Sequence, residues 1–248
     1  AFQNVFSVLD LSMDEPTLDD TMPDNERLIR AVQEATGAEH VGLTYQALKK
    51  LPDVLREQQF HVSAVLKNMD GKLMVYDVRP SGEEKLCAAA IDIGTTTVSG
   101  VILDMRDGKI LAKASSGNGQ IRFGADVINR IIESRKEGGQ EKLQKAIIEE
   151  TINPMLHNMC HAAGIHGSSI YHMCVASNTT MNHLFAGVNA DPLRMEPYIP
   201  AFFETDSINA YDLGLHVHPD ASVVIAPNIG SYVGGDITAG TLVSMSWN

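Results

Sequence analysis

The sequence predicts an α/β protein in which a small α+β module, residues 1–86, precedes a larger α/β domain, residues 87–248. The composition, with 44% hydrophobic and 20% charged residues, supplies enough apolar side chains for packed cores and excludes a disordered chain. Residues 80–85, Pro-Ser-Gly-Glu-Glu-Lys, have the composition of a linker. After this linker, apolar runs of strand period give way to runs of helical period, which indicates a second domain.

The first module is expected to contain three strands and two helices. In chain order these are a strand over 5–9, an acidic connection over 13–20, a helix capped by Asp24 or Asn25 and stopped by Gly37, a helix over 44–56 broken at Pro52, and strands over 61–66 and 73–78. The last two strands are predicted to form a hairpin, because Asp70-Gly71 supplies a left-handed turn at little cost.

The larger domain is expected to open with three antiparallel strands over 88–93, 98–105 and 110–114. The elements that follow are helices over 124–136 and 140–163, a strand over 170–176, a helix over 179–186, a strand over 223–226 and a helix over 236–245. Three antiparallel strands extended by strands that alternate with helices are typical of a ribonuclease-H-like layout.

Charge and composition exclude several classes of function. The formal net charge of −12 argues against nucleic acid as a partner, because a polyanion would be repelled over most of the surface. No apolar run is long enough to cross a membrane. The three cysteines, Cys87, Cys160 and Cys174, are too far apart in sequence for a disulfide framework or a CxxC metal site, so we expect a cytoplasmic protein.

One segment carries recognisable chemistry, Asp92-Ile93-Gly94-Thr95-Thr96-Thr97. Gly94 allows a tight turn between two strands, where three hydroxyls and successive N–H groups form a concavity that suits a phosphate. Asp92, at the end of a central strand, is placed to hold hydrated Mg²⁺ against the same phosphate. Threonine also favours strands for structural reasons, but the position of the segment at the start of a domain favours the phosphate role.

This hairpin resembles the first phosphate motif of the acetate-kinase, sugar-kinase, Hsp70 and actin superfamily. Four further segments, in the same order, resemble the reductive activators of corrinoid proteins: residues 118–120, 123–131, 177–184 and 233–240. Residues 15–20 and 25–28 of the first module resemble the middle domain of that family. The resemblance covers nearly the whole chain, and it implies that the larger domain is the first lobe of an actin-like ATPase domain.

The resemblance implies a protein that spends ATP, with Mg²⁺, to return the inactive Co(II) form of a corrinoid protein to Co(I) in methyl transfer. The electron would come from a [2Fe-2S] domain of the full-length parent, since three isolated cysteines cannot make its Cys₄ site. The second lobe is also expected outside this chain, so the chain by itself is expected to be inactive. The resemblance further suggests a dimer.

Carried over residue by residue, the resemblance gives Asp92 the Mg²⁺ and places Gly94 and Thr95 to Thr97 in the phosphate hairpin. Asn178 and Thr179 would face the γ-phosphate from the loop after the fourth strand. Asp236 is a further candidate for the nucleotide. Asp126, at the start of a predicted helix, is better explained as a favourable charge at the helix N-terminus.

Two other functions remain open from the residues. A small-molecule kinase of the same superfamily would need a carboxylate near the fourth strand as general base, and Asn178 stands there instead. An amide cannot take a proton, although a kinase that works by positioning alone is still compatible. The third reading is an interaction fragment with no activity of its own, which would follow if the second lobe is required for nucleotide binding.

Overall fold

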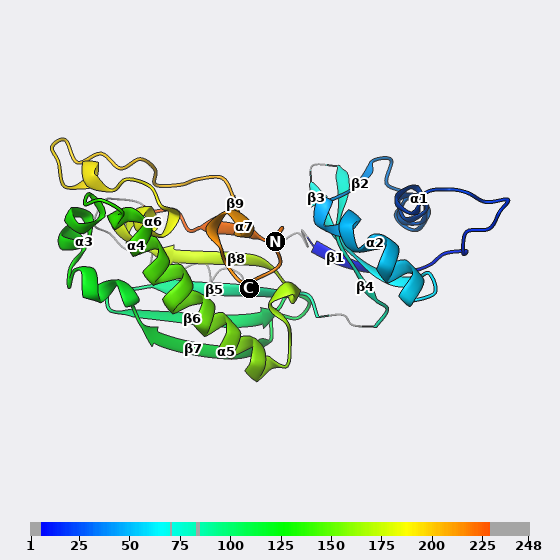
Figure 1. Ribbon diagram of the computed structural model, residues 1–248, viewed down its shortest axis with the longest axis horizontal. Helices are drawn as coiled ribbons and strands as arrows, with labels where there is room; N and C mark the ends of the chain where they lie inside the picture. The colour runs from blue at the N-terminus through cyan, green and yellow to red at the C-terminus, as the bar shows by residue number, and fades with distance from the viewer. Residues whose placement is uncertain (1–5, 70, 83–84, 229–248) are drawn as a thin grey trace. The chain divides into compact units, whose positions relative to one another are not determined.

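The computed structural model describes residues 6–69, 71–82 and 85–228, and the chain divides into two compact units, Ala1–Leu86 and Cys87–Asn248. Each unit is built around its own sheet (Figure 1). The strand order is β1-β3-β4-β2 in the first unit and β7-β6-β5-β8-β10-β9 in the second. Within the described residues, none of the helices is both long and apolar enough to cross a lipid bilayer.

The first unit packs two helices on a four-stranded sheet. Its elements are β1 (Phe6–Ser12), α1 (Asp24–Thr36), β2 (Val41–Leu43), α2 (Tyr45–Glu57), β3 (His61–Met69) and β4 (Lys72–Pro80). The predicted hairpin is confirmed, since β3 pairs antiparallel with β4, and β1 pairs antiparallel with β3. The short strand β2, parallel to β4, was not predicted, because three residues are too few to show a period.

Two details of the first unit correct the sequence predictions. Pro52 does not break the second helix but lies inside α2, where Leu51 and Leu55 are fully buried against the sheet. This packing offsets the missing N–H of the proline. The helix α1 starts after Pro23, which occupies the N-cap position, so Asp24 lies in the first turn rather than capping it; the predicted stop at Gly37 is confirmed.

The second unit has the ribonuclease-H-like order that the sequence predicts. Its strands and longer helices are β5 (Cys87–Ile93), β6 (Thr97–Asp104), β7 (Ile110–Gly117), α3 (Val127–Ser134), α4 (Gly139–Ile147), α5 (Asn153–Ala163), β8 (Ile170–Ser177), α6 (Thr179–Ala186), β9 (Ile208–Asn209), α7 (Ala210–Leu213) and β10 (Ser222–Ile225). Short 3₁₀ turns stand at Gly119–Phe123, Gly167–Ser169 and Asp191–Leu193. The predicted helix over 236–245 lies outside the described residues.

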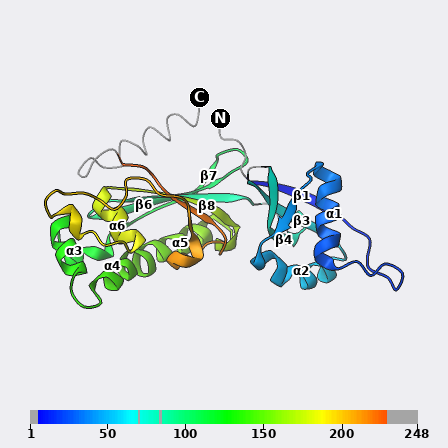
Figure 2. The same ribbon diagram turned by 90° about the horizontal axis from the view of Figure 1, so that it is seen from above.

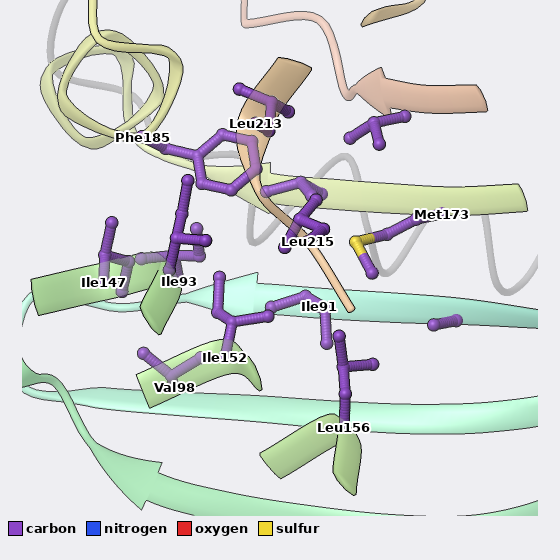
Figure 3. Packing of buried hydrophobic residues seen from close by; sticks show 14 of the residues in the cluster. Ile91, Ile93, Val98, Ile147, Ile152, Leu156, Met173, Phe185, Leu213 and Leu215 are labelled. Carbon is purple, nitrogen blue, oxygen red and sulfur yellow. The ribbon is translucent and has the colours of Figure 1, made fainter. Parts of the chain in front are cut away.

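Helices α3, α4 and α5 lie along one side of the six-stranded sheet (Figure 2). The core between them and the sheet is formed by alternate residues of the strands, such as Ile91 and Ile93 of β5. Figure 3 shows these side chains meeting residues from helices and loops, among them Ile147, Ile152, Leu156, Phe185, Leu213 and Leu215. Because strand side chains alternate, Asp92 between the two isoleucines belongs to the opposite face of the sheet.

Two predicted helices differ from the observed ones. The helix expected over 124–136 begins later, at Val127, because Asp126 is its N-cap. The helix expected over 140–163 is interrupted by a π-turn, Ile148–Ile152, between α4 and α5. Its predicted end is confirmed, since Gly164 takes the left-handed conformation after α5.

Candidate functional site

The candidate site lies at the edge of the second sheet where three parallel strands end. Strand β5 is parallel to β8, with Ile93 beside Ser177, and β8 is parallel to β10, with Val175 beside Ile225. The loop after each strand therefore reaches the same edge. In α/β sheets this edge is the usual place for a ligand.

The hairpin after β5 is held from behind through its carbonyl oxygens. The Gly94 carbonyl accepts a hydrogen bond of 2.8 Å from the Asn118 side-chain amide. The Thr95 carbonyl accepts one of 2.6 Å from Nη2 of Arg130, and the Thr96 carbonyl accepts one of 2.8 Å from the backbone N–H of Asn118. Three successive peptide groups thus have their oxygens bound by donors from other segments.

This arrangement determines where the N–H groups of the hairpin point. In a trans peptide the N–H is directed opposite to the C=O, so the N–H groups of Thr95 and Thr96 point away from Asn118 and Arg130. Within the described part of the chain, nothing accepts from these two N–H groups or pairs with the hydroxyls of Thr95, Thr96 and Thr97. Successive unpaired N–H groups with hydroxyls beside them form an arrangement that binds phosphate.

Gly94 is required by the close approach of the two strands. Its N–H donates to the Thr97 carbonyl at 2.9 Å, and a Cβ at position 94 would lie 2.7 Å from the same oxygen. Any larger residue would push the hairpin open. The sequence prediction of a tight turn at this glycine is therefore confirmed.

Asp92 lies in β5, two residues before the turn, with Ser99 and Ala176 beside it on the neighbouring strands. Its side chain is exposed, unlike those of Ile91 and Ile93. In the described part of the chain, no three histidine, cysteine or acidic side chains come together as a metal site. An exposed carboxylate at this place fits Mg²⁺, which usually keeps several waters and takes other ligands from phosphate.

Asn178 and Thr179 begin α6 at the same edge. The side-chain oxygen of Asn178 caps this helix by accepting from the Met181 N–H at 2.9 Å. The Thr179 hydroxyl accepts from the Asn228 side chain at 3.2 Å. The structure brings both residues next to the hairpin, and their contact with a γ-phosphate stays a prediction.

The other two acidic candidates, Asp126 and Asp236, are not placed at the hairpin by the described residues. Asp126 caps α3, accepting from the Asn129 N–H at 2.9 Å, in keeping with a structural role at the helix N-terminus. Asp236, with the segment 233–240, lies outside the described residues.

Three residues of this edge were not singled out from the sequence: Asn118, Arg130 and Asn228. The segments that contain the first two were noted, but not the contacts that these side chains make. Asn118 is 2% exposed and Arg130 is 0% exposed. Burial of these polar side chains marks them as functional candidates, and burial can be read from the folded structure but not from the sequence. Burial lowers the pKa of Arg130, while the charge of Asp126 acts in the opposite direction.

The cysteines do not form an iron–sulfur site. Cys87 and Cys160 are buried and Cys174 is half-buried, and all three are free thiols. Burial raises the pKa of the Cys160 and Cys174 thiols, which disfavours the thiolate that a cluster needs.

Comparisons with known proteins cover both units. A family model described as the RACo linker region matches residues 1–85, and one described as the RACo middle region matches residues 87–246. The first unit, expected from its sequence to correspond to the middle domain of the family, is matched by the linker-region model, and the middle-region model matches the second unit.

Two known proteins give the extent of the similarity. The corrinoid activation enzyme RamQ of Eubacterium limosum is 35% identical over 169 residues, which are 66% of this chain and 28% of RamQ. A solved structure of a reductive activator for corrinoid, iron-sulfur protein has 36% sequence identity and a TM-score of 0.78, over 97% of this chain and 38% of that chain. The chain thus spans less than half the length of either protein.

Proposed function

The chain belongs to the RACo family, and from this membership we propose that it is part of an ATP-dependent reductive activator that returns Co(II) corrinoid protein to Co(I). Both similar proteins are described by their action on corrinoid proteins. The corrinoid protein is therefore the proposed partner, and its cobalt the final electron acceptor. A dimer, as the family resemblance suggests, is part of the same proposal.

The second unit would supply the phosphate half of a nucleotide site. The N–H groups and hydroxyls of the hairpin, Gly94 to Thr97, would bind the phosphates of ATP, and Asp92 would hold Mg²⁺ through its waters. Thr179 and Asn178 would adjoin the γ-phosphate, with Asp236 as a further nucleotide contact. When bound, Mg–ATP supplies the free energy of hydrolysis that makes reduction of Co(II) favourable.

The observation that carries this proposal is the outward direction of the hairpin donors. Other segments of the protein bind the carbonyls of Gly94, Thr95 and Thr96, so the N–H groups of Thr95 and Thr96 face the opposite side, where a phosphate can accept from them. Because the cysteines do not fit a cluster, we place the [2Fe-2S] group in another part of the full-length protein. Free thiols suit a reducing compartment, so we propose a cytoplasmic location.

A small-molecule kinase is the weaker alternative. Its general base would have to stand near Asn178, but this side chain is an amide whose oxygen already caps α6. A kinase would transfer phosphate to a hydroxyl acceptor, which the activator would not do. Phosphoryl transfer from ATP to added alcohols or carboxylates by the full-length protein would favour the kinase.

The decisive experiment follows the visible spectrum of a Co(II) corrinoid protein mixed with the full-length protein and a low-potential reductant, with and without ATP. We expect the Co(I) band only with ATP, and we expect Asp92→Ala to abolish it. Asp107→Ala is the matched control, because it removes an exposed carboxylate from a neighbouring turn, and it should leave the reaction unchanged. A corrinoid that stays Co(II) in every mixture, with the cluster intact, would contradict the proposal.

Binding of Mg–ATP to the chain alone tests the hypothesis that this chain is an inactive interaction fragment. Because only one lobe is present, we expect weak binding of Mg–ATP, visible as a shift of the phosphate signals in ³¹P NMR at millimolar nucleotide. A complete lack of binding would favour the interaction fragment.

A further inference from the structure

Arg130 in α3 is a buried cation directly behind the hairpin. Its guanidinium donates to the Thr95 carbonyl at 2.6 Å and to the Gly124 carbonyl at 2.9 Å, and one Nη lies 3.4 Å from the Met181 sulfur. The side chain is 0% exposed. Among residues 6–69, 71–82 and 85–228, no carboxylate lies within ion-pair distance of it.

A buried charge without an opposite charge is costly for the folded protein. Neutral carbonyls and a sulfur satisfy the hydrogen-bonding capacity of Arg130 only in part, and none of these three partners carries an opposite charge. Asp126 is the acidic group that acts on it, by its field and not by contact. An anion bound on the other side of the hairpin would lower this cost, so the position of Arg130 favours phosphate.

The bond to Thr95 has a second effect. It orients the peptide group between Thr95 and Thr96, whose N–H then points away from Arg130. A charged donor on the carbonyl also polarises the peptide and strengthens the N–H as a donor. The contact with Met181 ties the same side chain to α6, which begins at Asn178 and Thr179.

We propose that Arg130 is a positioning residue for the phosphate: it holds the Thr95 carbonyl so that the Thr96 N–H is presented to the ligand, and its buried charge attracts the anion. This inference rests on the proposed function, since it assumes that the hairpin binds a phosphate. Arg130 does not touch the ligand itself.

The geometry requires arginine rather than another cation. The planar fork reaches Thr95, Gly124 and Met181 at once, which the single ammonium of a lysine cannot do. Gly124 allows its own carbonyl to approach α3 closely, because a Cβ there would lie 2.9 Å from the backbone nitrogen of Arg130.

The test compares Mg–ATP binding by the unchanged chain with that of Arg130→Gln, Arg130→Lys and Arg135→Gln, by ³¹P NMR. Arg135 is the matched control: it follows the same helix, and its side chain is 55% exposed. We expect a loss of affinity of about tenfold or more for R130Q, as for one hydrogen bond from a charged donor, a smaller loss for R130K, and no change for R135Q.

A second readout separates positioning from general stability. The ¹⁵N shift of the Thr96 amide reports the hydrogen bond on the Thr95 carbonyl, so it should move in R130Q and R130K but not in R135Q, without any nucleotide. Native-like circular dichroism identifies the variants that fold, and R130K decides alone if R130Q does not fold.

The outcomes are distinct. Unchanged affinity and an unchanged Thr96 shift in the folded variants would overturn the role of Arg130 and leave the proposed function standing. If the chain alone does not bind Mg–ATP, the same variants are compared in the full-length protein, and no binding there would refute the phosphate site and this inference with it.

Discussion

Two turns of one three-stranded meander differ in how their backbone is satisfied. In the turn between β6 and β7, side chains of the turn itself accept from its N–H groups: Asp104 from Arg106 at 2.9 Å, and Asp107 from Lys109 at 2.9 Å. In the turn between β5 and β6, the Gly94 N–H donates to the Thr97 carbonyl, and the other bonds come from outside the turn and bind the carbonyls of Gly94, Thr95 and Thr96. The first turn is self-contained, whereas the second depends on the rest of the unit.

This difference separates a turn whose own carboxylates pair its N–H groups from the turn that we propose binds phosphate. Carboxylates within the β6–β7 turn accept from the N–H groups of Arg106 and Lys109, and their negative charge disfavours an anion there. Asn118 and Arg130 consume the acceptors of the β5–β6 turn and leave its donors. A binding turn is therefore recognised by which half of each peptide is already paired, more than by its residue types.

The largest effect is expected from Gly94→Ala. The added Cβ would meet the Thr97 carbonyl at 2.7 Å, so we expect the free energy of unfolding to fall by about 1–3 kcal/mol and Mg–ATP binding to disappear. Gly108→Ala in the other turn, at φ 70°, should cost about 1–2 kcal/mol and leave binding intact. Urea unfolding and ³¹P NMR measure both quantities. Normal binding by G94A would show that the tight turn is not needed.

A smaller effect is expected from Asn118→Ala. This variant removes the side-chain bonds to the Gly94 carbonyl and from the Gln120 N–H, both in a buried place, so stability should fall by about 1–3 kcal/mol and Mg–ATP affinity with it. Asp107→Ala removes one exposed bond of the other turn and should cost less than about 1 kcal/mol, without effect on affinity. Equal Mg–ATP affinities for N118A and D107A would show that the bonds to the carbonyls of the β5–β6 turn do not matter for binding.

The smallest effect is expected on the pH dependence of stability, through His183 in the helix beside the hairpin, α6. His183 of α6 is neutral in the bonds it makes: Nδ1 donates to the Thr179 carbonyl at 2.7 Å, and Nε2 accepts from the Ala201 N–H at 3.0 Å. Burial lowers the pKa of His183 below its ordinary 6.5. The unfolded chain therefore takes up a proton first, and the free energy of unfolding should fall as the pH falls through about 6.5, until the folded form is protonated as well.

His183→Gln should flatten this part of the pH profile of stability, measured by urea unfolding across the range. His157→Gln, which changes an exposed histidine of α5, should leave the profile as it is. Identical pH profiles for the unchanged chain and H183Q would contradict the expectation that the neutral, buried His183 side chain, with its bonds to Thr179 and Ala201, makes stability depend on pH.

Local signals predicted part of this structure well. The helix expected over 179–186 is α6, Thr179–Ala186, because Asn178 is a good N-cap and Gly187 a good C-terminus. The interruption of the helix expected over 140–163 was missed, and it coincides with a contact from a distant residue. The Thr151 hydroxyl accepts from the Gly119 N–H at 3.1 Å, and a Cβ on Gly119 would lie 2.8 Å from the Ala146 carbonyl. The π-turn lies where this glycine approaches the helix.

The sequence by itself determined the order of the longer strands and helices and the position of the threonine hairpin, because periodicity and turn residues act over a few neighbours. Only the tertiary structure decided which way the peptides of that hairpin face. The donors that bind its carbonyls stand 24 and 35 residues away in the chain, at Asn118 and Arg130. A hydrogen bond over such a separation depends on how β5, the 118–123 turn and α3 pack together, and no local pattern encodes it.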